Sequence, residues 1–366
     1  MNVNCRKMFL QLFNDEPAEN NQTDNTRSIQ KMENFQDFID LCEKTNVTEI
    51  SRAISSHKTL SEQHSNIAQL NKILDTALII IFNHPIKFEY GYSYVQSWYS
   101  EKQNFSNSEF PPVQYPFNYI HINPREMTRG YNGEICMIKA YELGLRNIKG
   151  YFVIGDDAIL NFWQPINLDM VFHQWGTRYA ARGHKHWWTW DVGQKAMEKS
   201  IDFVKNDKSC KYCQKTMEEY RKRLLNRKLI NESDTAFAEM QRYEDWTVSD
   251  VYYIPSKEMP FFTNLMKIFY KGELFIECAL NKYLRAVEHQ IPINGYNLGP
   301  SSARSRTWSL VKLYSENVVY YHPIKMSQVV DNSDERYKYC SKVVTAYHKV
   351  LFLNANYTNG VYKEIF

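Results

Sequence analysis

The stretch Gly150-Tyr-Phe-Val-Ile-Gly-Asp-Asp-Ala-Ile-Leu-Asn-Phe-Trp163 decides the fold, because an apolar run there leads directly into two adjacent carboxylates, Asp156 and Asp157. A short apolar run rich in aromatic and β-branched residues is typical of a buried strand. In open α/β sheets, ligands bind beyond the carboxyl ends of the strands, where a metal-bound phosphate is expected. We therefore predict a metal site at Asp156 and Asp157.

A helix and an earlier strand precede this stretch. Asn132 is a good N-cap, apolar residues recur at near-helical spacing over residues 135–145, and Gly144 is placed to end the helix before a strand at 151–154. The apolar run Ala77–Phe82 predicts the earlier strand. A strand, a crossover helix and a second strand imply a parallel pair with the acidic residues at its carboxyl edge.

The chain divides into three parts. Residues 1–30 are polar and Asn-rich, which predicts a disordered lead. Residues 31–75 carry apolar positions at helical spacing and are expected to form an N-terminal helical appendage. Residues 76–366 are expected to form one α/β domain with a mostly parallel sheet flanked by helices, including a long helical region over 194–230.

The composition excludes several functional classes. Lys and Arg number 44 against 41 Asp and Glu, so the chain lacks the basic excess of a general nucleic-acid or anionic-membrane binder, and no nucleic-acid partner is expected. The strongest apolar run, Ala77–Phe82, is far shorter than the roughly 20 residues of a membrane-spanning helix. Met1–Phe13 shows no signal peptide. No transmembrane span is predicted in this chain.

Two features bear on the cellular compartment. Of seven cysteines, only Cys210 and Cys213 have motif spacing, and a local disulfide or free thiols are favoured there over a zinc or redox site. Five Asn-X-Ser/Thr sequons permit a secretory location without requiring it. These sequons begin at Asn21, Asn46, Asn104, Asn231 and Asn356.

The adjacent acids suit a hard divalent cation. Two carboxylates at one strand end repel each other unless a cation lies between them, and oxygen ligands favour Mg²⁺ or Mn²⁺ over zinc. Such an ion would act as a Lewis acid that neutralises charge on a departing nucleoside diphosphate. The alternative is a turn in which Asp156 and Asp157 cap the next helix.

A second element follows a predicted strand near residue 321. His322 could supply a third metal ligand, and Lys325 could supply a counter-charge for phosphate. The alternative is an ordinary surface or core histidine. The metal hypothesis therefore requires His322 to lie beside the Asp156–Asp157 pair.

Two further acids lie in distinctive local settings. Asp250 precedes the strand-like run Val251–Ile254, and Glu277 lies among apolar neighbours that would raise its pKa and suit a general base. The alternatives are an Asx-type cap at Asp250 and a salt-bridged helical Glu277, paired with Lys271 or Lys282.

Aromatic and basic residues after the central stretch could contact substrate. The tryptophans and histidines within 184–190 could form a stacking platform for a sugar or a gate over the site, and packing is the alternative. Arg178 and Arg182 could face an anionic donor, whereas Arg304 and Arg306 lie in a loop of the kind that closes over phosphates. Ordinary surface arginines are the alternative.

The order of the motifs resembles the STELLO-like glycosyltransferases over roughly residues 76–326. The motifs are Phe82-Asn-His-Pro85, Ala140-Tyr-Glu-Leu-Gly144, Gly150-Tyr-Phe-Val-Ile-Gly-Asp-Asp157 with Leu160-Asn161 and Trp163, Ser249-Asp-Val-Tyr-Tyr-Ile-Pro255, Phe275-Ile-Glu277 and His322-Pro-Ile-Lys325.

This resemblance implies a GT-A-type, Rossmann-like fold, a nucleotide-sugar donor, a Mn²⁺ (or Mg²⁺) cofactor and a Golgi setting. It implies that two acids, Asp250 and Glu277, face the acceptor or the sugar. It also implies that the metal and the diphosphate are bound by Asn83, Asp156, Asp157, His322 and Lys325. The motif is Asp-Asp-Ala and not Asp-X-Asp, so which carboxylate contacts the metal stays open.

The function expected from these features is metal-dependent transfer of a sugar from a nucleoside-diphosphate donor, a UDP-sugar in the first instance, to a glycan or glycoprotein acceptor. The alternative is a non-catalytic, glycosyltransferase-like scaffold or glycan-binding protein. A metal-dependent phosphohydrolase is less favoured, because no Asp-X-Asp-X-Thr/Val motif follows a strand.

Overall fold

The computed structural model describes residues 76–81, 134–145, 147–155, 157–179, 191–242, 245–297, 310–324, 329, 332–347 and 362–365. Several predictions lie outside these residues. They are the lead 1–30, the appendage 31–75, the aromatic cluster within 184–190, and Asn83, Asp156, Arg182, Arg304, Arg306 and Lys325.

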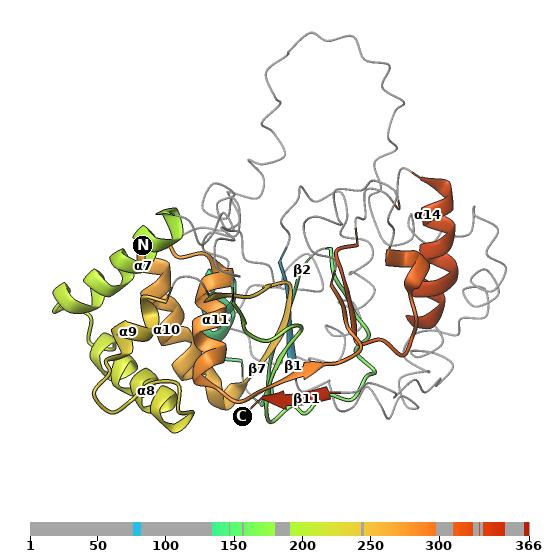
Figure 1. Cartoon of the computed structure of the whole chain (residues 1–366). Helices are drawn as coiled ribbons and strands as arrows, with labels where there is room; N and C mark the ends of the chain where they lie inside the picture. Colours follow the sequence, from blue (N-terminus) through green and yellow to red (C-terminus); the bar gives the residue numbers. More distant parts are fainter. Residues whose placement is uncertain are drawn as a thin grey trace, which may run out of the picture.

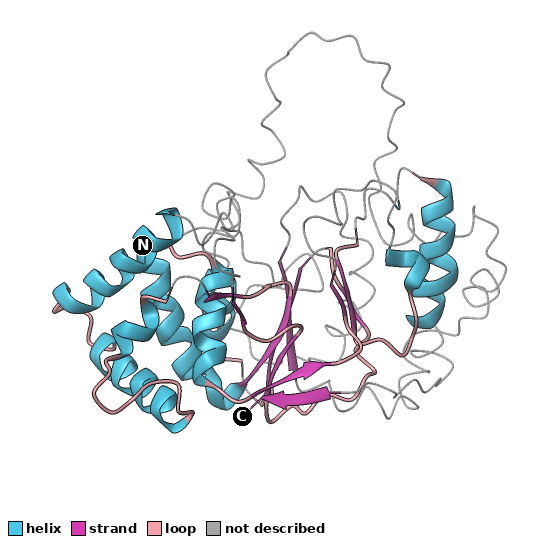
Figure 2. Cartoon of the chain, viewed as in Figure 1, coloured by secondary structure: helices cyan, strands magenta, loops and turns pink. Residues whose placement is uncertain are grey.

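Six strands in the described part of the chain form the central sheet (Figures 1 and 2). Their order across the sheet is β1 (Thr76–Ile81), β2 (Gly150–Gly155), β7 (Val251–Pro255), β4 (Val171–His173), β8 (His289–Pro292) and β11 (Tyr362–Ile365). The predicted crossover is confirmed, because β1 and β2 pair in parallel and α6 (Glu134–Glu142) lies between them in the chain. Gly144 ends this helix region with a φ of 63°.

The sheet is mixed, so the prediction of a mostly parallel sheet was wrong. β4 and β8 form the second parallel pair, whereas β7 runs antiparallel to both β2 and β4, and β11 runs antiparallel to β8. An apolar strand pattern does not encode strand direction, which depends on where the connecting segment re-enters the sheet. The long helical excursion before β7 permits either direction.

Helices cover one face of the sheet (Figure 1). The predicted helical region 194–230 is two helices, α7 (Asp191–Asn206) and α8 (Cys213–Asn226), and the break between them holds a Cys210–Cys213 disulfide. The short α9 (Ala236–Met240) follows. Then come α10 (Met259–Gly272) and α11 (Ile276–Ala286).

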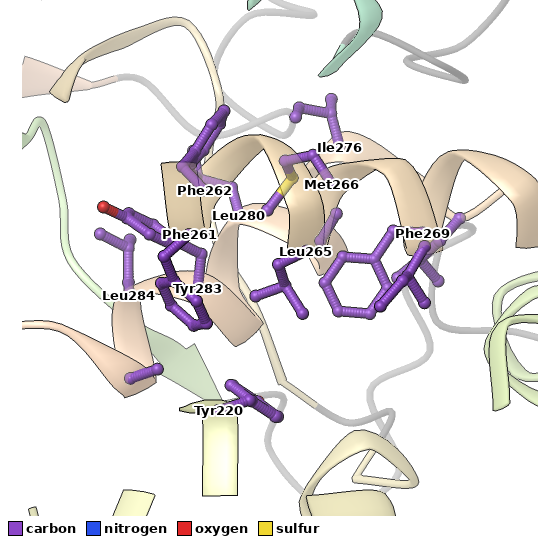
Figure 3. Close-up of a cluster of buried hydrophobic side chains, with 14 of the residues drawn as sticks. Tyr220, Phe261, Phe262, Leu265, Met266, Phe269, Ile276, Leu280, Tyr283 and Leu284 are labelled. Atoms are coloured by element: carbon purple, nitrogen blue, oxygen red, sulfur yellow. The ribbon is translucent and has the colours of Figure 1, made fainter. Parts of the chain in front are cut away.

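Alternating side chains of the strands divide the core into two parts. Tyr151 and Val153 of β2 pack with the helices, whereas Phe152 and Ile154 point to the opposite face. In the helical half, α10 packs against α6, α7 and α8 around a cluster of large apolar side chains (Figure 3). Both faces of the sheet are therefore buried, as the uninterrupted apolar strand predicted.

The second face is covered by a smaller sheet and a helical segment. This sheet has the order β3 (Ile159–Leu160), β10 (Tyr320–His322) and β9 (Tyr296–Asn297). The 3₁₀ turn Leu310–Leu313, α14 (Ser333–Lys338) and the π-helical turn Tyr339–Val344 complete this half. In addition, β5 (Arg178–Tyr179) pairs with β6 (Asp245–Trp246). None of the helices in the described residues is sufficiently long and apolar to cross a membrane.

Candidate metal centre

Asp157 and Asp250 are brought together by the antiparallel pairing of β2 and β7. Asp157 follows the end of β2, and Asp250 immediately precedes β7, so the antiparallel register places both at the same edge. The Gly155 backbone N–H donates a 2.7 Å hydrogen bond to the Asp250 carbonyl, which fixes this edge. In a parallel pair, the start of β7 would lie at the opposite end of β2.

His322 reaches the same edge through the small sheet. Strand β3 begins two residues after Asp157, and β10 pairs with it antiparallel, with Tyr321 opposite Ile159. The Ile324 N–H also donates to the Asp157 carbonyl at 2.5 Å. His322 at the end of β10 therefore lies beside Asp157, as the metal hypothesis required.

The three side chains form a compact donor set. His322 Nε2 lies 3.2 Å from Asp250 Oδ1 and 3.4 Å from Asp157 Oδ1. One ligand atom from each residue lies within 4.8 Å of the others. Adjacent ligands of an octahedral cation with metal–ligand distances of about 2.1 Å lie about 3 Å apart. The donor set could therefore hold a metal ion.

The capping alternative does not hold for Asp157. The segment after Asp157 is a turn, with the Ala158 N–H bonded to the Gly155 carbonyl at 3.1 Å, and it continues into strand β3. No helix therefore begins there for the Asp157 side chain to cap. A Cβ at Gly155 would lie 3.5 Å from Asp157 Oδ1 and 3.6 Å from Asp250 Cβ, which is ordinary van der Waals contact, so these two residues do not require a glycine there.

Glu277 lies on the first turn of α11 and is linked to the metal-site segment. The Thr247 N–H donates to the Glu277 carbonyl at 3.0 Å, three residues before Asp250. Glu277 Oε2 is buried and has no hydrogen-bond partner among the described residues. Burial, with a smaller contribution from the Asp250 charge, raises the pKa of Glu277 to about 8. The carboxyl is therefore poised to exchange a proton near neutral pH.

The alternative for Glu277, an ion pair with Lys271 or Lys282, is not formed among the described residues. Lys282 instead donates to the backbone carbonyls of Glu239 and Arg242, and it is fully buried in that position. Within the described part of the chain, Glu277 makes no ion pair. This leaves its carboxyl as a chemically unusual group close to the candidate metal centre.

His173 holds the segment that carries Asp250, and the sequence did not point to it. Its Nε2 lies 2.8 Å from the Val248 carbonyl, and its Nδ1 accepts the backbone N–H groups of Trp175 and Gly176 at 3.1 and 2.7 Å. Burial lowers the pKa of His173 to about 3, so the ring is neutral and donates from Nε2. His173 thereby joins the segment before β7 to the turn after β4.

Gln174 extends this support to the side-chain carboxylate of Asp250. Its side-chain amide donates to Asp250 Oδ2 at 3.4 Å, and its backbone N–H donates to the Val251 carbonyl at 3.2 Å. These contacts depend on a tight turn in which Gly176 has a φ of 69°. A lone glycine and a lone histidine gave no motif from which this support could have been predicted.

The structure and the predictions agree in part. Asp157 and His322 lie together, Asp250 joins them, and Glu277 is connected through Thr247. Asp250 was expected to face the acceptor or sugar, and its position places it in the group that could hold a metal ion. The remaining predicted site residues, Asn83, Asp156 and Lys325, lie outside the described residues.

An α/β sheet with two carboxylates and an imidazole gathered at one edge defines an α/β protein with a candidate divalent-metal site. The chain belongs to the STELLO glycosyltransferase family, whose model matches residues 1–251. This match includes Asp157 and Asp250, while Glu277 and His322 lie beyond it. Neither a curated protein nor a solved structure matches the chain. The resemblance read from the motifs is therefore confirmed at the level of the family.

Proposed function

We propose that this protein is a metal-dependent glycosyltransferase that moves a sugar from a nucleoside-diphosphate donor, with a UDP-sugar the first candidate, to a hydroxyl of a glycan or glycoprotein. The observation that carries the proposal is the group formed by Asp157, Asp250 and His322, from three separate segments. Family membership supports the reaction class.

The residues of the group would hold Mn²⁺ or Mg²⁺. When bound, such an ion would supply Lewis-acid stabilisation of the negative charge on the leaving diphosphate. Asp157 and Asp250 would supply oxygen ligands and His322 a nitrogen ligand. The hydrogen bonds from His173 and Gln174 would keep the Asp250 segment in place, because ligands need such support to hold their geometry.

Glu277 is the proposed general base. Its raised pKa gives the carboxylate form enough basicity to accept a proton from an acceptor hydroxyl. Asp250 would then act as a metal ligand, and its negative charge contributes to the raised pKa of Glu277 only where no cation is bound. Asn83, Asp156 and Lys325 remain proposed contacts to the donor on the strength of the motif resemblance.

We also propose that the protein works in the Golgi lumen. The Cys210–Cys213 disulfide and the participation of Cys340 in a disulfide support a compartment that is oxidising, because such bonds are rare in the cytosol.

Donor turnover tests the proposal. Hydrolysis and transfer would be measured with UDP-hexoses and UDP-N-acetylhexosamines in Mn²⁺, for the wild type, Asp157→Asn and the control Asp202→Asn. Asp202 is an exposed acid on α7. We expect Asp157→Asn to lower turnover by about 100-fold or more, because a metal ligand is lost. Equal turnover in the wild type and Asp157→Asn would contradict the metal role.

Calorimetry separates this proposal from the scaffold alternative. The enzyme should bind UDP or GDP in the presence of Mn²⁺, and Asp157→Asn should bind it more weakly. A folded chain that binds neither nucleotide with Mn²⁺ would favour a non-catalytic scaffold.

A further inference from the structure

A pocket with a volume of about 210 Å³ lies next to the candidate metal centre. Gln174 connects the two, because it lines the pocket and also donates its side-chain amide to Asp250. Tyr320, two residues before His322 on β10, is another lining residue. The pocket is smaller than the roughly 300–1,000 Å³ of sites for drug-sized ligands, so it suits a single ring with its substituents.

Arg178 supplies the charge of this pocket and is held in a defined orientation. Its guanidinium carbon lies 4.2 Å from the centroid of the Trp175 ring, and Trp175 packs edge-on against Trp246 at 5.8 Å. The pairing of β5 with β6 places Arg178 opposite Trp246. A guanidinium stacked on an aromatic face keeps its N–H groups in its own plane, where they can bind a carboxylate or phosphate through two hydrogen bonds.

The charge of Arg178 has no protein counter-charge among the described residues, where it forms no ion pair with a carboxylate. Its Nε is buried and has no hydrogen-bond partner there. Arg178 is partly buried, and this burial lowers its pKa because the charged form is partly desolvated. A partly buried cation of this kind is stabilised by an anionic ligand that replaces the lost water.

The rest of the pocket suits a sugar ring. Gln174 Oε1 is buried without a partner among the described residues, so it can accept a hydrogen bond from a hydroxyl group. Ile291, Pro292 and Ile293 form an apolar wall of the pocket, and Ile293 is 64% exposed. Gly295 lies against the Tyr320 ring, where a Cβ would come within 1.9 Å of a ring carbon. An apolar wall and polar groups together fit the C–H face and the hydroxyls of a sugar.

We infer that this pocket binds a sugar unit that carries an oxyanion, either a carboxylate or a phosphate, with Arg178 on the anion and Gln174 on a hydroxyl. The inference rests on the proposed function, because it identifies this unit as part of a substrate of the adjacent metal centre. It adds the substrate class, which neither family membership nor the metal ligands define.

Ligand-observed saturation-transfer NMR on the full chain in Mg²⁺ tests the inference. The probes are D-glucuronate, glucose 6-phosphate, glucose and inorganic phosphate. We expect one or both of the anionic sugars to bind at least about tenfold more tightly than glucose and inorganic phosphate. Arg178→Gln should lose this preference, Arg178→Lys should weaken it, and the control Arg242→Gln, at an exposed arginine, should keep it.

Several outcomes would overturn the inference. They are equal binding of glucose and the anionic sugars, phosphate binding as tight as that of the sugars, no binding of either anionic sugar, or undiminished binding by Arg178→Gln. Mn²⁺ titration of the same proteins checks folding and separates the two proposals. Arg178→Gln should keep Mn²⁺ binding and lose the sugar, whereas Asp157→Asn should lose Mn²⁺ binding and keep the sugar.

Discussion

His322 Nε2 lies 3.4 Å from Asp157 Oδ1, although a large part of the chain separates the two residues. Two adjacent strand pairings produce this contact. The β3–β10 pairing brings His322 to the end of β2, and the β2–β7 pairing adds Asp250 from the other side. The strand pairings, and not the three ligand side chains, hold this edge of the sheet together. Loss of one ligand side chain should therefore affect metal binding more than folding.

Replacement of Glu277 by Gln should abolish most of the transfer activity. Loss of a general base lowers turnover by about 100- to 10,000-fold, while donor binding should change little. The measurement is the rate of transfer and the dissociation constant for UDP with Mn²⁺. Glu273→Gln is the matched control, because Glu273 is exposed and lies just before α11.

The wild-type rate should also depend on pH through Glu277. Because burial is the main cause of the raised pKa of Glu277, which is about 8 without a bound cation, and because the carboxylate is the basic form, transfer should increase with pH and level off once Glu277 is ionised. A cation on Asp250 would move this midpoint to lower pH. A rate that is constant between pH 6 and pH 9, or Glu277→Gln with wild-type turnover, would contradict the assignment.

Replacement of Glu134 by Gln should reduce the dependence of stability on pH. Glu134 is fully buried, its two carboxylate oxygens have no hydrogen-bond partner among the described residues, and burial raises its pKa from 4.5 to about 8. The folded state therefore keeps the proton to a higher pH than the unfolded state does. The stability from this group is fully present below pH 4.5 and is lost as the pH rises towards 8.

Urea unfolding at pH 5 and pH 8 measures this effect. Each pH unit between the two pKa values costs about 1.4 kcal/mol for one such group, so the wild type should lose more unfolding free energy than Glu134→Gln over this range. Glu142→Gln, at a half-exposed position on the same helix, serves as the control. Equal losses in the wild type and Glu134→Gln would show that Glu134 is ionised in the folded protein.

Asn231 should carry a glycan if the protein works in the Golgi lumen. The sequon Asn231-Glu-Ser233 is exposed in the turn between α8 and α9, and the Asn231 N–H donates to the Asp234 side chain at 2.8 Å. Endoglycosidase treatment of protein from its native cells, followed by peptide mass spectrometry, tests this. Asn231→Gln should remove one glycan and Asn226→Gln, outside any sequon, should remove none. Unmodified Asn231 in the native protein would count against the lumenal location.

Local features of the sequence were sufficient for the β1–α6–β2 unit. The spacing of apolar residues and Gly144 both act within one helix, and β1 and β2 are apolar along their length, whereas the predicted cap Asn132 lies outside the described residues. The proximity of Asp157 and His322 followed from their positions after predicted strands. Predicting this proximity also required the hypothesis that His322 is a metal ligand, since no local pattern in the sequence indicates that β3 pairs with β10.

The role of Asp250 could not be predicted in the same way. Its position in the metal group follows from the direction of β7, and strand direction is a property of the chain path. The sequence left open whether Arg178 faces an anionic donor or is an ordinary surface arginine, because its surroundings come from β6, the turn at Gly176 and the segment after β8. His173 gave no signal because its function is to accept and donate backbone hydrogen bonds.

Binding of Mn²⁺ to the full chain, followed by electron paramagnetic resonance, tests the central claim most directly. The account predicts one site in the wild type and in Asp202→Asn, and affinity at least about tenfold weaker in Asp157→Asn, Asp250→Asn and His322→Ala, since each removes one ligand. Wild-type affinity in all three ligand variants would contradict the claim that these residues form the metal centre.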